Sequence, residues 1–177
     1  MALILTSSVR LIATTFLTII VHLQFGKMMH EEADFREGRE RIGPLFQDPN
    51  DQLFCPTVAE DVAFGPLNLG KRPEGAREIV RETLETLGLA GFEDRVTYKL
   101  SGGEKKLISL ATVLAMKPEV LLLDEPTSGL DEEATERIIQ VLNRSSTSYM
   151  IISQDKGLLA KTTRCIYKMV NGKLEGV

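Results

Sequence analysis

The sequence predicts an α/β domain built on a mostly parallel sheet. From Arg41 onward, apolar runs with the length of strands alternate with stretches that have the period of helices. The run 119–123 (EVLLL) follows Pro118 and precedes two acidic residues, as expected of a strand that is buried on both faces. A chain of 177 residues with 43% apolar and 26% charged residues has room for one hydrophobic core.

Amphipathic helices are predicted before and after this strand. The first covers 76–87 and is followed by Gly88, which suits a left-handed C-terminal cap. Its apolar face consists of Ala76, Ile79, Val80, Leu84 and Leu87. The second begins after Asp131, a favourable N-cap residue. Its inward face consists of Ala134, Ile138, Val141 and Leu142.

Further strands are predicted at both ends of the sheet. Residues 149–153 have the pattern of a buried strand, and Asn171-Gly172 between two extended runs predicts a hairpin with a type I′ turn. Pro44 removes a ladder hydrogen bond from the strand that precedes Gln47. We therefore expect that strand to lie at a sheet edge or to contain a bulge.

Residues 1–35 form an atypical apolar N-terminal segment, in which positions 2–25 carry one formal charge, at Arg10. The apolar run 11–25 is shorter than the ~20 residues of a membrane-spanning helix and contains three threonines. No basic region precedes it, as a secretory signal would require. Two interpretations stay open: a membrane anchor or signal, and a buried strand or helix rich in Thr, Ile and Val.

The overall charge disfavours a nucleic-acid partner. A formal net charge of −4 and a pI near 5.3 do not provide the basic face that phosphate backbones require. The two cysteines lie far apart in the sequence and predict neither a disulfide framework nor a metal site. This composition is typical of a reducing compartment.

The segment 100–106 (LSGGEKK) predicts a helix whose N-terminus can receive an anion. Ser101 followed by Glu104 three residues later forms a capping box. Gly102 and Gly103 then lie in the first turn, where the absence of side chains lets an anion approach the backbone amides closely. The alternative is an ordinary capped helix.

The segment 121–131 (LLLDEPTSGLD) places two carboxylates at the end of the apolar strand. Asp124 and Glu125 leave the strand together, and Pro126 then turns the chain. Two adjacent carboxylates can divide two chemical roles between them. The alternative is a solvated acidic loop.

Together these segments resemble the signature, Walker B and D-loop motifs of ABC-type ATPases, and 41–70 resembles the Q-loop region of that family. The strings FQDPNDQLF and AFGPLNLG are most similar to the ATPases of cobalt, nickel and vitamin importers of the energy-coupling-factor type. The resemblance covers about residues 36–177, interpreted as a partial ABC ATPase domain. It implies a P-loop NTPase-like ABC ATPase fold, ATP and Mg²⁺ as ligands, and a second ATPase subunit as partner.

The resemblance also implies roles for single residues. Asp124 would hold Mg²⁺ through water, and Gln47 would touch the metal and the attacking water. Glu125 would orient and deprotonate that water. The other implied residues are Leu100, Ser101, Gly102, Gly103 and Glu104 at the nucleotide, Ser128 and Asp131 in the D-loop, and Gln154 at the switch position.

The sequence departs from the family in two places. No stretch satisfies the P-loop pattern GxxxxGK[ST], and the nearest string, 21–28 (VHLQFGKM), is interpreted as coincidence. The usual spacing would place that loop at or before Met1, so we expect a domain incomplete at the N-terminus whose central sheet lacks partners. Gln154 stands where the family has His and cannot carry an imidazolium charge.

We therefore interpret the chain as a truncated ATP-binding subunit of an importer, impaired in hydrolysing ATP alone. It would form a homo- or heterodimer and meet an integral membrane subunit at the cytoplasmic face of the membrane, where the membrane subunits choose the solute. One alternative is a non-catalytic module that donates its signature helix to a complete ATPase. Another is a gene remnant without a role.

Overall fold

The computed structural model describes residues 2–4, 38, 40–170 and 173–176. Within them, six strands form one sheet in the order β2-β3-β4-β1-β5-β6. The strands are β1 (Ala2–Ile4), β2 (Ile42–Leu45), β3 (Val120–Asp124), β4 (Ser148–Ile152), β5 (Ile166–Val170) and β6 (Lys173–Gly176). The helices are η1 (Pro49–Asp51), α3 (Val58–Asn68), α4 (Pro73–Thr86), η2 (Thr97–Lys99), α5 (Gly102–Ala115), α6 (Glu132–Arg144) and α7 (Lys156–Thr162).

The described sheet is parallel except at β5 and β6, which confirms the predicted fold class. β2 is an edge strand of this sheet, so Pro44 lies where its missing N–H is tolerated, as predicted. β5 and β6 pair antiparallel, as the hairpin prediction requires, and the turn at 171–172 lies outside the described residues.

β1 comes from the atypical segment 1–35 and lies between β4 and β5, paired in parallel with both. The expectation that the central strands lack partners is therefore not met at this position. The run 11–25 and the string 21–28 lie outside the described residues. Among the residues that are described, no helix has the length and apolarity needed to cross a bilayer.

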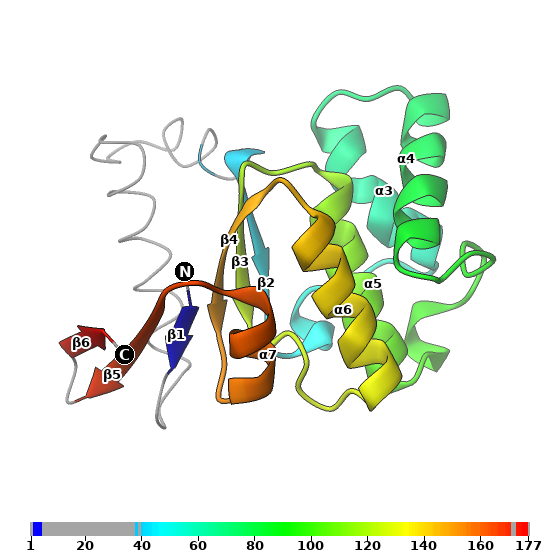
Figure 1. Ribbon diagram of the computed structural model, residues 1–177. Coiled ribbons are helices and arrows are strands. Elements are labelled where there is room, and N and C mark those ends of the chain that lie inside the picture. The colour runs from blue at the N-terminus through cyan, green and yellow to red at the C-terminus, as the bar shows by residue number, and fades with distance from the viewer. Residues whose placement is uncertain (1, 5–37, 39, 171–172, 177) are drawn as a thin grey trace.

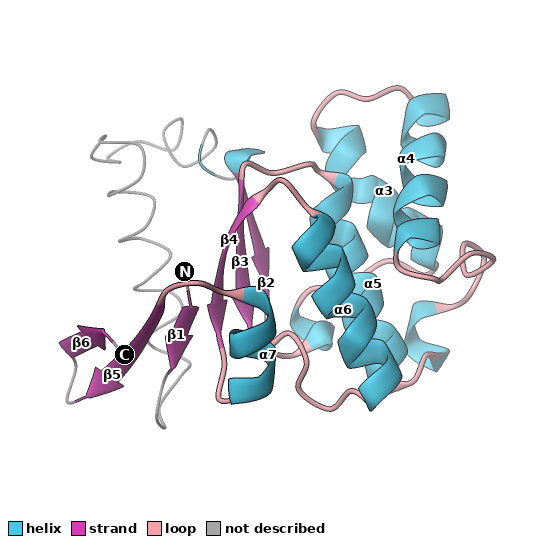
Figure 2. Ribbon diagram, viewed as in Figure 1, coloured by secondary structure: helices cyan, strands magenta, loops and turns pink. Residues whose placement is uncertain are grey.

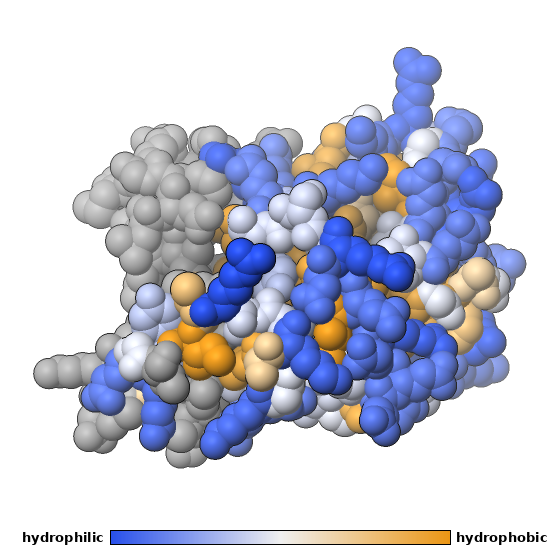
Figure 3. Space-filling view, in the orientation of Figure 1, coloured by the Kyte–Doolittle hydropathy of each residue, from blue (hydrophilic) through white to orange (hydrophobic). Residues whose placement is uncertain are grey.

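The helices α3, α4, α5 and α6 lie on one side of the sheet (Figures 1 and 2). α5 is the central one and contacts β2, η1, α3, α4 and α6. Its residues Ile108, Leu110 and Ala111 are completely buried. Hydrophilic side chains cover most of the α4 and α6 surface in the view of Figure 3, as the predicted amphipathic pattern requires.

The helix caps agree with the predictions. Gly88 follows α4 with φ of +68°, and Asp131 accepts a 2.8 Å hydrogen bond from the Ala134 amide at the start of α6. At the start of α5, the Ser101 amide donates to Glu104 Oε2 at 2.8 Å, and the Glu104 amide donates to Ser101 Oγ at 3.2 Å. This is the predicted capping box.

A strained residue lies just after the end of α5. Lys117 has φ of +52°, in the left-handed region that side chains other than glycine rarely adopt. Its amide donates to the Leu114 carbonyl at 2.9 Å, so it has the position at which helices commonly place glycine.

We expect Lys117→Gly to raise the free energy of unfolding by about 0.5–1 kcal/mol, because glycine adopts this conformation without the steric cost of a Cβ. Urea denaturation measures the change. Gly88→Ala is the opposite control and is expected to lower the stability. An unchanged midpoint in Lys117→Gly would show that the left-handed residue is not strained.

The capping box of α5 predicts a pH dependence. The backbone hydrogen bond from Ser101 holds the pKa of Glu104 below its usual range, with a further contribution from Arg95, whose guanidinium lies 3.1 Å from Glu104 Oε1. A carboxyl whose pKa is lower in the folded state stabilises the fold above its ordinary pKa. That stabilisation is lost as the pH falls through the folded-state pKa.

We therefore expect Glu104→Gln to cost about 0.5 kcal/mol at neutral pH and to cost almost nothing near pH 3. Urea denaturation at both pH values tests this. Glu74→Gln is the matched control, because Glu74 lies in the first turn of α4, whose N-cap makes no side-chain hydrogen bond. A cost that is equal at the two pH values would contradict the prediction.

Candidate functional site

The parallel pairing of β2, β3 and β4 defines where the predicted site residues meet. Because these strands run in the same direction, the segments that follow them emerge at one edge of the sheet. Gln47 follows β2, Asp124 and Glu125 lie at the end of β3, and Gln154 follows β4. The structure thus brings four of the predicted residues to the carboxyl edge of three neighbouring strands.

Asp124 offers an unused oxygen at this edge. Its Oδ1 atom is buried and is one of two buried side-chain oxygens, among the described residues, that have no hydrogen-bond partner. Burial raises the pKa of Asp124, the Glu125 charge raises it further, and the Lys106 ammonium opposes both. An unpaired buried carboxylate oxygen is costly unless a ligand or water meets it.

These residues fit a magnesium ion that is held together with phosphates. The carboxylate of Asp124 and the amide oxygen of Gln47 are hard oxygen ligands of the kind that Mg²⁺ prefers. In the described part of the chain, His, Cys, Asp and Glu form no group of three that could hold a metal by themselves. Mg²⁺ commonly binds through one or two carboxylates plus the oxygens of a phosphate substrate, which is the arrangement that this edge allows.

Glu125 is oriented by the segment that follows β4. Its Oε2 accepts a 2.8 Å hydrogen bond from Ser153 Oγ, and its Oε1 accepts a 3.0 Å hydrogen bond from the Gln154 amide. The backbone of Glu125 has φ of +44°, a left-handed conformation that costs energy outside glycine. Such strain concentrates at functional sites, and here it aims the carboxylate at the neighbouring strand end.

Ser153 is a site residue that the sequence reasoning missed. It is completely buried, and its Oγ accepts a 3.1 Å hydrogen bond from the Asp155 amide while it donates to Glu125. The available signal was its place at the end of a predicted strand, directly before Gln154. The side chain of Gln154 is exposed, and its backbone amide makes the contact to Glu125.

The signature residues lie at the N-terminus of α5. Gly102 leaves open space in front of the helix, whereas the side chains of Ser101 and Glu104 bond within the chain. A Cβ placed on Gly102 would meet no atom within 4 Å, so the space in front of this turn is open. Alanine would fit there and form a better helix, so packing within this chain does not explain the glycine. The glycine leaves the amides of this turn open to the approach of an external group. Ser101 and Glu104 use their side chains in the capping box.

Leu100 and the D-loop residues surround this turn. The side chain of Leu100 is buried in the core, so it supports the turn from beneath. A Cβ on Gly103 would lie 3.4 Å from Leu130 Cδ2, which places the D-loop directly beside the signature turn. Ser128 is exposed and its amide donates to the Glu125 carbonyl at 3.2 Å, while Asp131 is committed to capping α6.

Lys106 is a second residue that the sequence reasoning missed. Its side chain is 2% exposed, and its Nζ donates to the carbonyls of Phe46 at 3.1 Å and Gln47 at 2.8 Å. Burial lowers the pKa of Lys106, and the charges of Asp124 and Glu125 oppose that shift. Its helical spacing from the buried Leu110 was the signal that it points inward.

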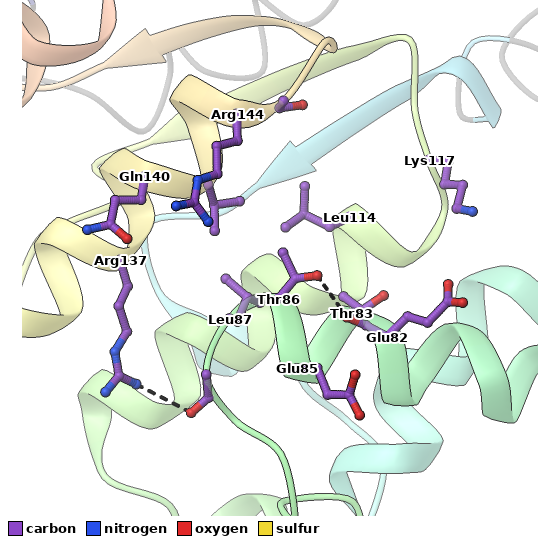
Figure 4. A pocket seen from close by; sticks show the side chains of 13 residues that line it. Glu82, Thr83, Glu85, Thr86, Leu87, Leu114, Lys117, Arg137, Gln140 and Arg144 are labelled. Atoms are coloured by element: carbon purple, nitrogen blue, oxygen red, sulfur yellow. Dashed lines mark hydrogen bonds between the residues drawn. The ribbon is translucent and has the colours of Figure 1, made fainter.

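A hollow of about 500 Å³ lies away from these residues, between the C-terminal ends of α4 and α5 and one face of α6 (Figure 4). None of the predicted site residues lines it. Arg137 bridges it by pairing with Glu133 and donating to the Gly88 carbonyl at 3.4 Å. Basic side chains near helix C-termini are stabilising in themselves, which accounts for this arrangement without a ligand.

Comparison with known proteins agrees with the motifs. A profile of the ABC transporter family matches residues 13–128. A putative ABC transporter ATP-binding protein of Brucella suis is 48% identical over 169 residues, which cover 91% of this chain and 71% of the relative. A second, from Nitratidesulfovibrio vulgaris, is 59% identical over 133 residues, covering 75% of this chain and 49% of the relative.

An energy-coupling factor transporter ATP-binding protein, EcfA of Methanothermobacter thermautotrophicus, is 46% identical over 139 residues, covering 77% of this chain and 45% of EcfA. The chain thus spans about half the length of two of these relatives. The solved structure of cbiO1 from Clostridium perfringens, part of the ABC transporter complex cbiONQ, superimposes with a TM-score of 0.82 at 29% identity, covering 98% of this chain and 74% of cbiO1. Both the sequence and the fold therefore assign this chain to the ABC transporter family of ATP-binding proteins.

Proposed function

We propose that this chain is an ATP-binding, energising subunit of an ABC importer of the energy-coupling-factor or cobalt/nickel type. The observation that carries the proposal is the open space at Gly102, in the first turn of a capped helix whose own packing does not require a glycine. The named relatives EcfA and cbiO1 support the importer type.

The residues at the sheet edge have distinct roles in this proposal. Asp124, through water, and Gln47 would hold Mg²⁺, which would neutralise phosphate charge. Glu125 accepts a proton from the water that attacks the γ-phosphorus of ATP, and ADP leaves with the electron pair of the broken P–O bond. Gln154 donates a hydrogen bond to a γ-phosphate oxygen, which gives weaker charge stabilisation than an imidazolium would.

A second ATPase subunit that carries a P-loop would complete the site. The 177 residues contain no GxxxxGK[ST] string to surround the phosphates of ATP. The helix N-terminus at Ser101, Gly102 and Gly103 is nevertheless fully formed. We infer that this chain contributes that helix to ATP whose phosphates are bound by the partner's P-loop. If the chain contributes nothing but this helix, it is the non-catalytic module that the sequence also allows.

The partner in the membrane would meet an apolar patch at α3. Phe54 and Phe64 stack edge to face with ring centroids 4.7 Å apart, although their exposed fractions are 67% and 47%. Leu67 and Leu69 remain exposed at the C-terminal end of α3, and Tyr98 is exposed beside its N-terminal end. Exposed patches of this kind mark interaction surfaces. We assign this one to a helix of an integral membrane subunit, which holds the chain at the cytoplasmic face.

We expect the 177-residue chain by itself to hydrolyse ATP no faster than its Glu125→Gln variant, because no lysine and glycine amides of a P-loop hold the phosphates. A phosphate-release assay with Mg²⁺ measures both rates. Magnesium-dependent turnover that Glu125→Gln abolishes would overturn this expectation.

We further expect the chain to restore ATPase activity in trans. A complete ATPase subunit of the same transporter, with its own signature serine disabled, should regain part of its rate when this chain is added. Gly102→Asp should abolish the rescue, because a carboxylate in the first turn repels phosphate and blocks its approach to the amides.

Gly75→Asp is the matched control for this assay. Gly75 lies in the first turn of α4, and a Cβ there also meets no atom within 4 Å. This variant should rescue as well as the wild-type chain does. Equal rescue by the Gly102→Asp chain, or rescue by neither chain, would reject the proposed trans site.

A further inference from the structure

The loop 46–52, which carries Gln47, is tied to one face of α5 by side-chain hydrogen bonds. Gln52 Nε2 donates to the Ser109 carbonyl at 2.9 Å and to Thr112 Oγ1 at 2.8 Å. Lys105 Nζ donates to Asn50 Oδ1 at 3.0 Å. Lys106 adds its two bonds to the backbone carbonyls of Phe46 and Gln47. These contacts extend from the first turn of α5 to its third. The loop is therefore attached to the helix at several positions along its length.

The Lys106 contact differs from the others in its energetics. Its ammonium is buried, so each hydrogen bond is made by a charged donor that has lost water. It also bonds to the main chain directly after β2, where the loop begins, whereas Lys105 reaches an exposed asparagine side chain. If the loop moved away from α5, a buried cation would lose the two carbonyl oxygens that accept its hydrogen bonds.

We propose that Lys106 is the positioning residue that fixes the Gln47 loop on the signature helix, so that the loop and the helix N-terminus move as one rigid unit. The roles of Gln47 and of the helix N-terminus rest on the proposed function. The attachment itself does not, because it is a property of the chain without ATP. Lys106 touches neither the nucleotide nor the water in this proposal. It holds the main chain of the loop, and its charge also acts on the neighbouring carboxylates of Asp124 and Glu125.

Hydrogen–deuterium exchange of peptides that cover 46–52 tests this attachment. We expect Lys106→Met, which fills the same space without a donor, to speed exchange there by about tenfold or more. Lys106→Gln keeps two N–H donors in a side chain that is one atom shorter, and exchange should be clearly slower than in Lys106→Met. Lys105→Met, the neighbouring-lysine control, should stay within about threefold of wild type.

Urea midpoints of the same variants separate loop release from global destabilisation. Unchanged exchange in Lys106→Met, or equally fast exchange in Lys106→Gln and Lys106→Met, would overturn the proposal. If Lys106→Met does not fold, the ¹⁵N NMR signal of the Lys106 ammonium in the wild-type chain decides instead. A slowly exchanging ammonium supports the attachment, and an ammonium that exchanges as fast as the exposed lysines rejects it.

Discussion

The burial of α5 is the constraint on which the rest of the site depends. This helix packs against the sheet and against three other α-helices, with several side chains that solvent does not reach. The core therefore determines the direction of the helix, and the helix begins beside Leu130 of the D-loop. In a closely packed interior, a change of even one methylene is felt by its neighbours. The packing of α5 therefore determines the position of the open turn at Gly102.

Short-range sequence patterns were sufficient for most elements. The helix after Asp131, the cap at Gly88, the box between Ser101 and Glu104, and the edge strand with Pro44 all rest on local rules for caps and periodicity. These rules act within a few residues, so a single sequence contains them completely. The predicted helix 76–87 starts later than α4 does because Pro73 is tolerated at the first helical position.

The features that sequence reasoning missed depend on contacts between distant residues. Two adjacent lysines follow the signature motif. The spacing from Leu110 indicates that Lys106 points inward, but only the packing shows that it bonds to the loop after β2, while Lys105 reaches an exposed side chain. Ser153 gains its importance from a carboxylate that is 28 positions away in the sequence. Glu104 illustrates the reverse case, since its carboxylate is occupied by the capping box and by Arg95. A sequence motif identifies the position of a residue but does not show which distant residue its side chain contacts.

The place of β1 in the sheet has a consequence for folding kinetics. β1 pairs with β4 and β5, so residues at one end of the sequence hydrogen-bond to residues near the other. The chain between them must be brought into a closed loop before those bonds can form, and parallel pairing over such separations is slow. The pair β2 and β3 and the helices around α5 involve shorter separations. We therefore expect folding in which the α5 region orders first and the sheet closes last, through an intermediate whose β4 edge is exposed to other chains.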